Sequence, residues 1–329
     1  MDFFRHHDRD FHLMKHALKF NILSIIMFLL AVFFLATRGL HFSVEFTGGT
    51  LLEITFPEAP HVEEIRQTLI KHGINDAEVQ RSGTSHDIMI RLPNRAASTE
   101  ESATGEDTND INQRLSDQVM QALSDGLQGS EIPVLHRNEF VGPQVGDELA
   151  TNGIMALVFV LAGVMIYLAM RFEWRFSISA IIAHFHDVII ILGFFALFQW
   201  EFSLSVLAAT LAVVGYSVNE SVIVFDRVRE TFRKRRDLNT AQVLDHAITQ
   251  TMSRTVITHT STLMIAISML IFGGDVLRYF ALALTIGIIF GVYSSIFVSS
   301  PIVMWLGVTR EHFIPPPKKK DASPDGAVV

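Results

Sequence analysis

Six long apolar runs are the sequence feature that most restricts what this chain can fold into. Each is close to the roughly 20 apolar residues that a helix needs to cross the hydrocarbon core of a bilayer. The runs are residues 20–37, 149–170, 177–199, 203–225, 255–272 and 277–305. Hydrophobic residues make up 49% of the 329 residues and charged residues only 18%, which is too apolar for an ordinary soluble protein. The sequence therefore predicts an α-helical integral membrane protein with six transmembrane helices.

The first run, residues 20–37, could also be the apolar part of a secretory signal peptide. Its end reads Phe-Phe-Leu-Ala-Thr-Arg-Gly, which contains no convincing small-x-small cleavage site. The five later runs also favour a retained anchor. We therefore expect the first run to be a true transmembrane helix.

Basic residues predict how the six helices are oriented, because Lys and Arg are retained on the cytoplasmic side of a membrane. They gather in residues 1–19, between the second and third runs, in the loop 226–254 and in the tail 307–329. With six spans, all these segments fall on one side. We expect both termini in the cytoplasm and residues 149–306 to hold helices two to six.

The segment 38–148 is then a soluble domain on the opposite, periplasmic side. Residues 38–150 contain 8 basic and 19 acidic residues, so the acidity of the chain is concentrated there. Alternating and helical apolar patterns predict the order strand, helix, strand, strand, helix, strand at residues 51–56, 61–72, 78–81, 87–92, 111–127 and 132–141. This βαββαβ order predicts a ferredoxin-like α+β domain. The Ser-, Thr- and acid-rich residues 94–109 suggest a flexible insertion.

Charge and composition exclude several classes of function. The formal net charge of −8 argues against general binding of nucleic acid. The chain contains no cysteine, which excludes disulfides, Cys-based zinc sites and thiol nucleophiles. Any site chemistry must therefore come from His, Asp and Glu.

Two carboxylates fall within predicted transmembrane helices, where an ionisable group costs roughly 2.5–3.5 kcal/mol and marks a functional candidate. Asp187 lies too deep in its run to be solvated from the helix end. Glu220 lies nearer the cytoplasmic end, so snorkelling toward that surface is the alternative to a functional role. Asn219 adds a second polar group beside Glu220.

Two histidines accompany Asp187 in the third run. His184 and Asp187 share a helix face, whereas His186 points roughly 200° away from His184. This spacing predicts no metal site, and interhelical hydrogen bonding is the simpler interpretation of both histidines.

The fifth run opens with Arg254 and an unusual density of hydroxyl side chains. Thr258 and Thr262 lie one and two turns beyond Arg254 on the same helix face. These residues could line a polar path beside Glu220 and Asp187. The alternative is that Arg254 only anchors the end of the helix.

Glycines mark two further structural features. Gly48 and Gly49 lack the Lys and the following helix of a phosphate loop, and so favour a tight turn. In the sixth run, Gly287 and Gly291 form a small-xxx-small pattern that predicts close helix contact.

Together these segments resemble the SecD/SecF family of the RND superfamily. The resemblance rests on the sequences at residues 44–49, 141–149, 186–188, 214–221, 225–230, 253–255, 272–274 and 293–295. Its motif positions include Glu45, Gly48, Gly49, Gly142, Pro143 and Gly215. Two positions depart from the family, which often has Asp where this chain has Glu45 and Glu220. A carboxylate is preserved at both, although its reach is longer by one methylene.

The resemblance implies an RND-type half bundle that pairs with SecD in the bacterial inner membrane. It implies a non-enzymatic accessory subunit of the Sec export machinery that uses the proton gradient, with no cofactor, to drive late steps of polypeptide translocation. The implied partners are SecD, the SecYEG channel, YajC and the exported unfolded polypeptide. The family's proton-path residues map onto Glu220 and Arg254, and we add Asp187, Asn219 and Thr258 as candidates.

Two other functions remain open from the sequence. One is a proton-coupled RND-type half-transporter for small hydrophobic molecules or lipids. The other is a non-transporting assembly scaffold, which would not need Asp187 and Glu220 at membrane depth. RND pumps usually fuse two halves with two large outer domains, so a lone half with one domain fits the export subunit better.

Overall fold

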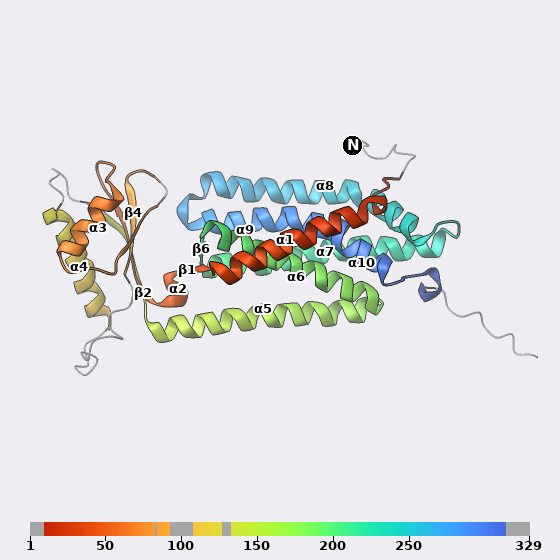
Figure 1. Ribbon diagram of the computed structural model, residues 1–329, viewed down its shortest axis with the longest axis horizontal. Helices are drawn as coiled ribbons and strands as arrows, with labels where there is room; N and C mark the ends of the chain where they lie inside the picture. Colours follow the sequence, from red (N-terminus) through yellow and green to blue (C-terminus); the bar gives the residue numbers. More distant parts are fainter. Residues whose placement is uncertain (1–9, 83, 93–107, 127–132, 314–329) are drawn as a thin grey trace, which may run out of the picture.

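The computed structural model describes residues 10–82, 84–92, 108–126 and 133–313. It consists of an elongated helical bundle with one α+β domain at its end (Figure 1). We call the end of the bundle that meets this domain the sheet end, and the opposite end the distal end. Most of the predicted insertion 94–109 lies outside the described residues.

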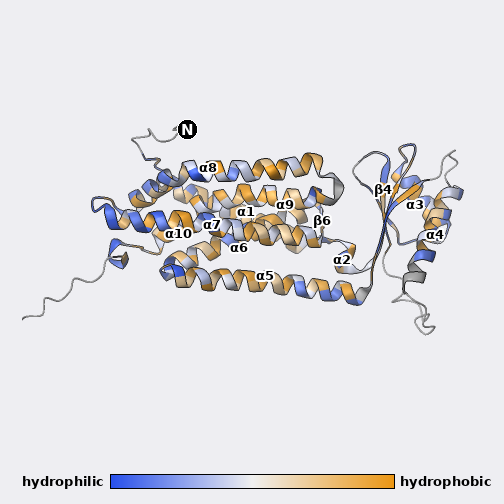
Figure 2. Cartoon of the chain, turned by 180° about the vertical axis from the view of Figure 1, so that it is seen from behind, coloured by the Kyte–Doolittle hydropathy of each residue, from blue (hydrophilic) through white to orange (hydrophobic). Residues whose placement is uncertain are grey.

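Six helices or helix runs are long and apolar enough to cross a membrane, which confirms the predicted number. They are α1 (Ala17–Thr37), α5 (Pro143–Arg171), α6 (Trp174–Phe198), α7 (Leu204–Lys234), α8 (Thr240–Phe272) and the run of α9 (Gly274–Ser294), η4 (Ser295–Ser299) and α10 (Ser300–Trp305). Short helical turns, η1 (Met14–His16) and η5 (Arg310–Phe313), flank the bundle. Apolar residues predominate along these helices, whereas the distal ends are more hydrophilic (Figure 2).

Helices α6, α7 and α9 form the centre of the bundle, since about half of their membrane-spanning residues are buried. Helices α1, α5 and α8 lie around them and expose most of their apolar side chains. The close contact predicted for Gly287 is present. A Cβ atom there would lie 2.3 Å from Cγ2 of Val213, so α9 packs directly on α7.

The α+β domain has the predicted βαββαβ order, with α3 (Val62–Lys71) and α4 (Thr108–Gly126) inserted between strands. The strands are β2 (Gly49–Thr55), β3 (Glu78–Arg81), β4 (Asp87–Leu92) and β5 (Val134–Val141). Their spatial order is β3-β4-β2-β5, with every pair antiparallel. This confirms the ferredoxin-like fold. Alternation places Leu52, Ile54, Ile88 and Ile90 on the face that packs against both helices.

A second, very small sheet connects the domain to the bundle. Strand β1 (His41–Phe42) pairs in parallel with β6 (Glu201–Phe202), which joins α6 to α7. The amide of Ser43 continues this connection by donating to the Phe202 carbonyl at 3.0 Å. The entrance to the α+β domain is therefore attached to the start of α7.

The expected loop 226–254 is largely helical, which corrects the sequence interpretation. Helix α7 continues to Lys234 and α8 begins at Thr240, so only residues 235–239 connect them. Glu230 bonds Arg227 and Lys234 at helical spacing. A capping box between Asn239 and Gln242 starts α8. The charged residues led to the expectation of a loop outside the membrane. The ion pairs and the capping box instead support helix on both sides of residues 235–239.

Candidate functional site

The double glycine forms the tight turn that the sequence predicted. After the short helix α2 (Val44–Thr47), Gly48 and Gly49 have φ values of 69° and 126°, a region that favours glycine. The start of α5 packs against this turn, because a Cβ atom on Gly146 would lie 2.9 Å from the Gly48 nitrogen. Gly146 therefore permits a contact that any larger residue would prevent.

Other family-motif positions shape helix ends and surfaces. Gly142 is the N-cap of α5, and Pro143 is its first residue. The missing N–H of proline costs nothing there, because the first N–H groups of a helix have no partner within the helix. The carboxylate of Glu45 accepts from the Leu204 amide at 2.6 Å and from the Ser43 hydroxyl at 3.2 Å. Gly215 lies on an exposed face of α7 with open space around it. Glu45 is thus joined to the helix that carries Glu220.

Asp187 is the centre of a fully enclosed polar cluster between α6, α7 and α9. Its Oδ2 atom accepts from the hydroxyls of Ser217 at 3.0 Å and Ser294 at 2.8 Å, while Oδ1 lies 3.3 Å from Nδ1 of His186. The Asp187 side chain is 1% exposed. Three hydrogen-bond donors therefore converge on one carboxylate.

The hydrogen bonds of this cluster assign tautomers to both histidines. The Ser217 hydroxyl donates to Asp187, so its oxygen accepts from Nδ1 of His184 at 3.1 Å. This is the interhelical bond predicted for His184. His186 instead bonds the neighbouring Asp187, and its ring stacks on Phe28 of α1. Nε2 of each histidine is buried without a hydrogen-bond partner among the described residues.

Glu220 occupies a second buried position, three residues beyond Ser217 on α7, between α7 and α8. The hydroxyl of Thr255 donates to its Oε1 atom, and Nδ1 of His259 lies 4.0 Å from its Oε2 atom. Glu220 is 3% exposed. The Glu220 side chain therefore lies inside the bundle and does not extend toward the distal surface.

Among the described residues, three expected path residues make no side-chain hydrogen bond or ion pair with Glu220. Arg254 and Asn219 are exposed, and the hydroxyl of Thr258 donates to the Arg254 carbonyl of its own helix at 2.9 Å. Successive helical residues are about 100° apart, so when Thr255 faces α7, Arg254 must point elsewhere. The rotation of α8 about its own axis was therefore not predicted from the sequence.

Four contacting residues were not predicted as site residues: Ser217, Thr255, His259 and Ser294. Thr255 and His259 are four residues apart, which places both on the face of α8 that meets Glu220. A signal was present, since polar residues at this spacing line one face of an otherwise apolar helix. Ser294 falls within the motif at residues 293–295, but no local pattern indicated its contact with Asp187, which lies 107 positions away.

No three Asp, Glu, His or Cys side chains come close enough to hold a metal ion in the part of the chain that the structure describes. The carboxylates and imidazoles at depth are held instead by hydroxyls and by one another. Their arrangement suits binding and releasing protons, because each carboxylate has neighbours that donate hydrogen bonds and an imidazole close by.

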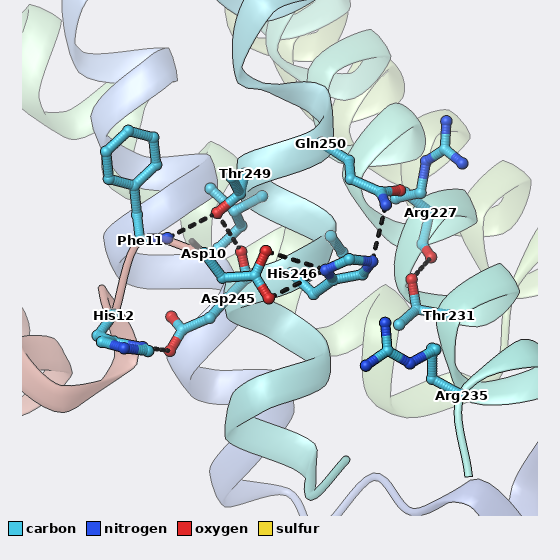
Figure 3. A network of polar contacts seen from close by, with 12 residues as sticks. Asp10, Phe11, His12, Arg227, Thr231, Arg235, Asp245, His246, Thr249 and Gln250 are labelled. Atoms are coloured by element: carbon cyan, nitrogen blue, oxygen red, sulfur yellow. Dashed lines mark hydrogen bonds and ion pairs between the residues drawn. The ribbon is translucent and has the colours of Figure 1, made fainter. Parts of the chain in front are cut away.

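A separate polar network joins the N-terminal segment to the distal part of α8 (Figure 3). Both carboxylate oxygens of Asp10 lie 3.0 Å from Nδ1 of His246, and the Met14 amide donates to Asp245 at 2.8 Å. Gln250 contacts the other ring nitrogen of His246 at 2.7 Å. The network attaches the start of α1 to the helix that carries Thr255 and His259.

The fold and the buried carboxylates define a multi-pass membrane protein with one α+β domain. Comparison with known families agrees with this. Residues 125–309 match the family described as Protein export membrane protein SecD/SecF, C-terminal, and residues 33–56 match the SecD/SecF GG Motif. The chain belongs to the SecD/SecF family, as the sequence resemblance indicated.

The chain is similar in sequence to several curated proteins named Protein translocase subunit SecF. The protein of Vibrio alginolyticus is 41% identical over 92% of this chain and 91% of its own length. That of Haemophilus influenzae is 42% identical over 91% of this chain and 87% of its own. That of Escherichia coli O157:H7 is 37% identical over 93% of this chain and 91% of its own. The chain is therefore a subunit of a Sec translocase.

Solved structures of SecDF share the fold. SecDF from Thermus thermophilus, described as a translocon-associated membrane protein, superposes with a TM-score of 0.77 at 33% identity over 91% of this chain. SecDF in a super-membrane-facing form gives a TM-score of 0.64 at 34% identity, also over 91% of this chain. In each case this chain spans 39% of the length of the SecDF chain.

Proposed function

We propose that this subunit uses the proton motive force, together with SecD, to drive late steps of polypeptide translocation across the bacterial inner membrane. The observation that carries the proposal is the burial of Glu220 between α7 and α8 in contact with Thr255 and His259. A buried carboxylate at membrane depth is costly, and alternate protonation makes it a natural ion carrier. Asp187 is the second carrier candidate.

Among the proposed partners, SecD is the one that the comparisons support. The SecDF chains are longer than this one and contain a counterpart of it, so we infer that SecD supplies the remaining half. The SecYEG channel, YajC and the emerging unfolded polypeptide complete the proposed assembly. We propose no enzymatic activity and no cofactor, with the proton gradient as the energy source.

A proton-coupled half-transporter for small hydrophobic molecules or lipids is the competing function. It would use the same buried carboxylates, so the site alone does not separate it from export. The identity of the transported substrate separates the two functions. Vesicles containing the reconstituted complex should show gradient-dependent export of a secretory polypeptide, whereas the competing function predicts gradient-dependent movement of a lipophilic dye.

The decisive variants are at Glu220. Glu220→Gln keeps the volume and hydrogen-bonding capacity of the side chain but cannot bind and release a proton. The complex should still assemble, and the gain in export caused by a proton gradient should be lost. Glu220→Asp should retain part of that gain. Wild-type export by Glu220→Gln vesicles would assign Glu220 to packing and move the carrier role to Asp187.

The proposed orientation has its own test. Since the chain has no cysteine, single cysteines provide labels without background. A cysteine placed within residues 94–109 should react in intact cells with an impermeant thiol reagent, and one at Arg233 should not. Labelling at residue 233 in intact cells would contradict cytoplasmic termini.

A further inference from the structure

His259 is a buried ionisable side chain that lies outside the proton path predicted from the sequence. Its ring is held between α8 and α7, with 10% of the side chain exposed. Nδ1 lies 2.8 Å from the Thr255 carbonyl one turn earlier. The ring meets Tyr216 edge to face, with 4.9 Å between centroids. These contacts fix the position of the ring beside Glu220.

The hydrogen bonds also fix where the neutral ring carries its proton. A carbonyl oxygen can only accept, so Nδ1 is the protonated nitrogen of the neutral imidazole. The lone pair is then on Nε2, and this atom is buried without a hydrogen-bond partner among the described residues. Leaving a hydrogen-bond acceptor unpaired inside a protein costs free energy, so this atom calls for an explanation.

Few other charges surround the ring. From α7 the titratable groups in contact are Glu220 and Tyr216, and the hydroxyl of Tyr216 accepts from Thr262 at 3.3 Å. On α8 itself the neighbours are the hydroxyls of Thr255 and Thr258. Helix α9 also packs on α8, and between its two tyrosines it has no acidic or basic residue. Glu220 is therefore the carboxylate with which His259 can exchange a proton.

We propose that His259 is a second proton-binding group of the Glu220 site and relays protons to that carboxylate. This inference rests on the proposed function. A hydronium ion supplied by the proton gradient gives its proton to the Nε2 lone pair, which leaves a water molecule and forms an imidazolium. The ring then turns away from the Thr255 carbonyl and closes the 4.0 Å separation between Nδ1 and Oε2 of Glu220. The Nδ1–H bond breaks, an O–H bond forms on Glu220, and a neutral imidazole protonated at Nε2 remains.

The experiment compares His259→Asn with a matched control. The Asn amide can replace the Nδ1 donor to the Thr255 carbonyl, but it cannot bind a proton. In the α+β domain, His72 makes the same contact, with Nδ1 2.8 Å from the Thr68 carbonyl one turn earlier. His72→Asn therefore makes the same chemical change outside the bundle.

Infrared spectroscopy after a pH jump on the assembled complex gives a readout besides export. The carboxyl band that disappears in Glu220→Gln reports the protonation of Glu220. In His259→Asn the rate at which this band appears should fall about 100-fold, the low end of what a positioned acid–base group contributes. His72→Asn should keep the wild-type rate. A fixed structural role for His259 would move the final amplitude of the band without slowing its appearance.

The outcomes separate this inference from the proposed function. A His259→Asn rate within twofold of wild type would overturn the relay, while loss of export in Glu220→Gln would leave the proposed function in place. If Glu220→Gln exports normally, the carrier role proposed for Glu220 fails and passes to Asp187, but the band rate still tests proton transfer from His259. If His259→Asn does not assemble, His259→Gln is measured in the same way, and an unchanged rate overturns the relay.

Discussion

The carboxylate of Glu45 accepts a hydrogen bond of 2.6 Å from the backbone N–H of Leu204, 159 positions later in the chain. Leu204 is the first residue of α7, where backbone N–H groups have no partner within the helix. A negative charge there also interacts favourably with the helix dipole. The short helix α2, which precedes the α+β domain, thus caps the helix that carries Ser217 and Glu220.

Glu45→Ala should lower the free energy of unfolding by about 1 kcal/mol, the usual effect of losing a helix cap. Glu45→Gln keeps an acceptor and should lose only about 0.5 kcal/mol, the share that comes from the charge. Thermal unfolding in detergent measures both. Glu58→Ala, at an exposed position of the same domain, is the control. Equal stability of Glu45→Ala and wild type would show that this contact does not stabilise α7.

Stability should also depend on pH through Glu201. Burial raises the pKa of Glu201, and this effect is partly offset by Arg91 and His41. Below the ordinary carboxyl pKa the group is neutral in both folded and unfolded states. As the pH rises through the raised folded-state pKa, the unfolded chain ionises more easily and stability is lost. Glu201→Gln should therefore match wild type near about pH 4 and unfold at a higher temperature near about pH 7.

The matched control for Glu201 is Glu58→Gln, since Glu58 is exposed. Its unfolding temperature should follow that of wild type across the same pH range. A difference between Glu201→Gln and wild type that does not change with pH would attribute the effect to packing rather than ionisation.

The contact between Gly287 and Val213 should tolerate no added methyl group. Gly287→Ala places a Cβ atom 2.3 Å from a Val213 methyl and should cost about 1–3 kcal/mol. Val213→Ala should restore part of this loss when the two changes are combined. Gly163→Ala in α5, where a Cβ atom meets open space, should not destabilise the protein. Thermal unfolding of the four variants decides whether α7 and α9 need this close approach.

The N-terminal segment should depend on Asp245. Asp245→Ala leaves the buried Met14 amide without its acceptor, a loss of about 1–3 kcal/mol. The expected result is faster trypsin cleavage after the exposed Lys15. Asp237→Ala removes only an exposed ion pair with Arg235 and should leave the cleavage rate unchanged. Equal cleavage of both variants would show that Asp245 does not hold this segment.

The sequence predicted what depends on patterns within one segment. Six apolar runs gave six helices, and alternation over residues 87–92 gave a strand with those same bounds. The order of elements was enough to predict the ferredoxin-like domain, because few topologies connect that order compactly. The carboxylates at depth also stood out without any structure, since burial of an ionisable group in an apolar run is rare.

Features that depend on contacts between distant segments could not be predicted from the sequence. The rotation of α8 decides that Thr255 and His259 face Glu220 while Arg254 is exposed, and packing against α7 and α9 sets that rotation. The sequence did not predict that α7 and α8 extend beyond their apolar runs, because those extensions are rich in charged residues. Similarly, the capping of α7 by Glu45 joins two segments that only the folded chain brings together.

The chain enters the α+β domain past Gly48 and leaves it past Gly146, and at these two glycines the backbones touch. Both connections of the domain therefore pass through one narrow point, next to the attachment between β1 and β6. Because Glu45, just before this narrow point, also accepts from the first amide of α7, the entrance to the domain and the start of the helix carrying Glu220 share one set of contacts.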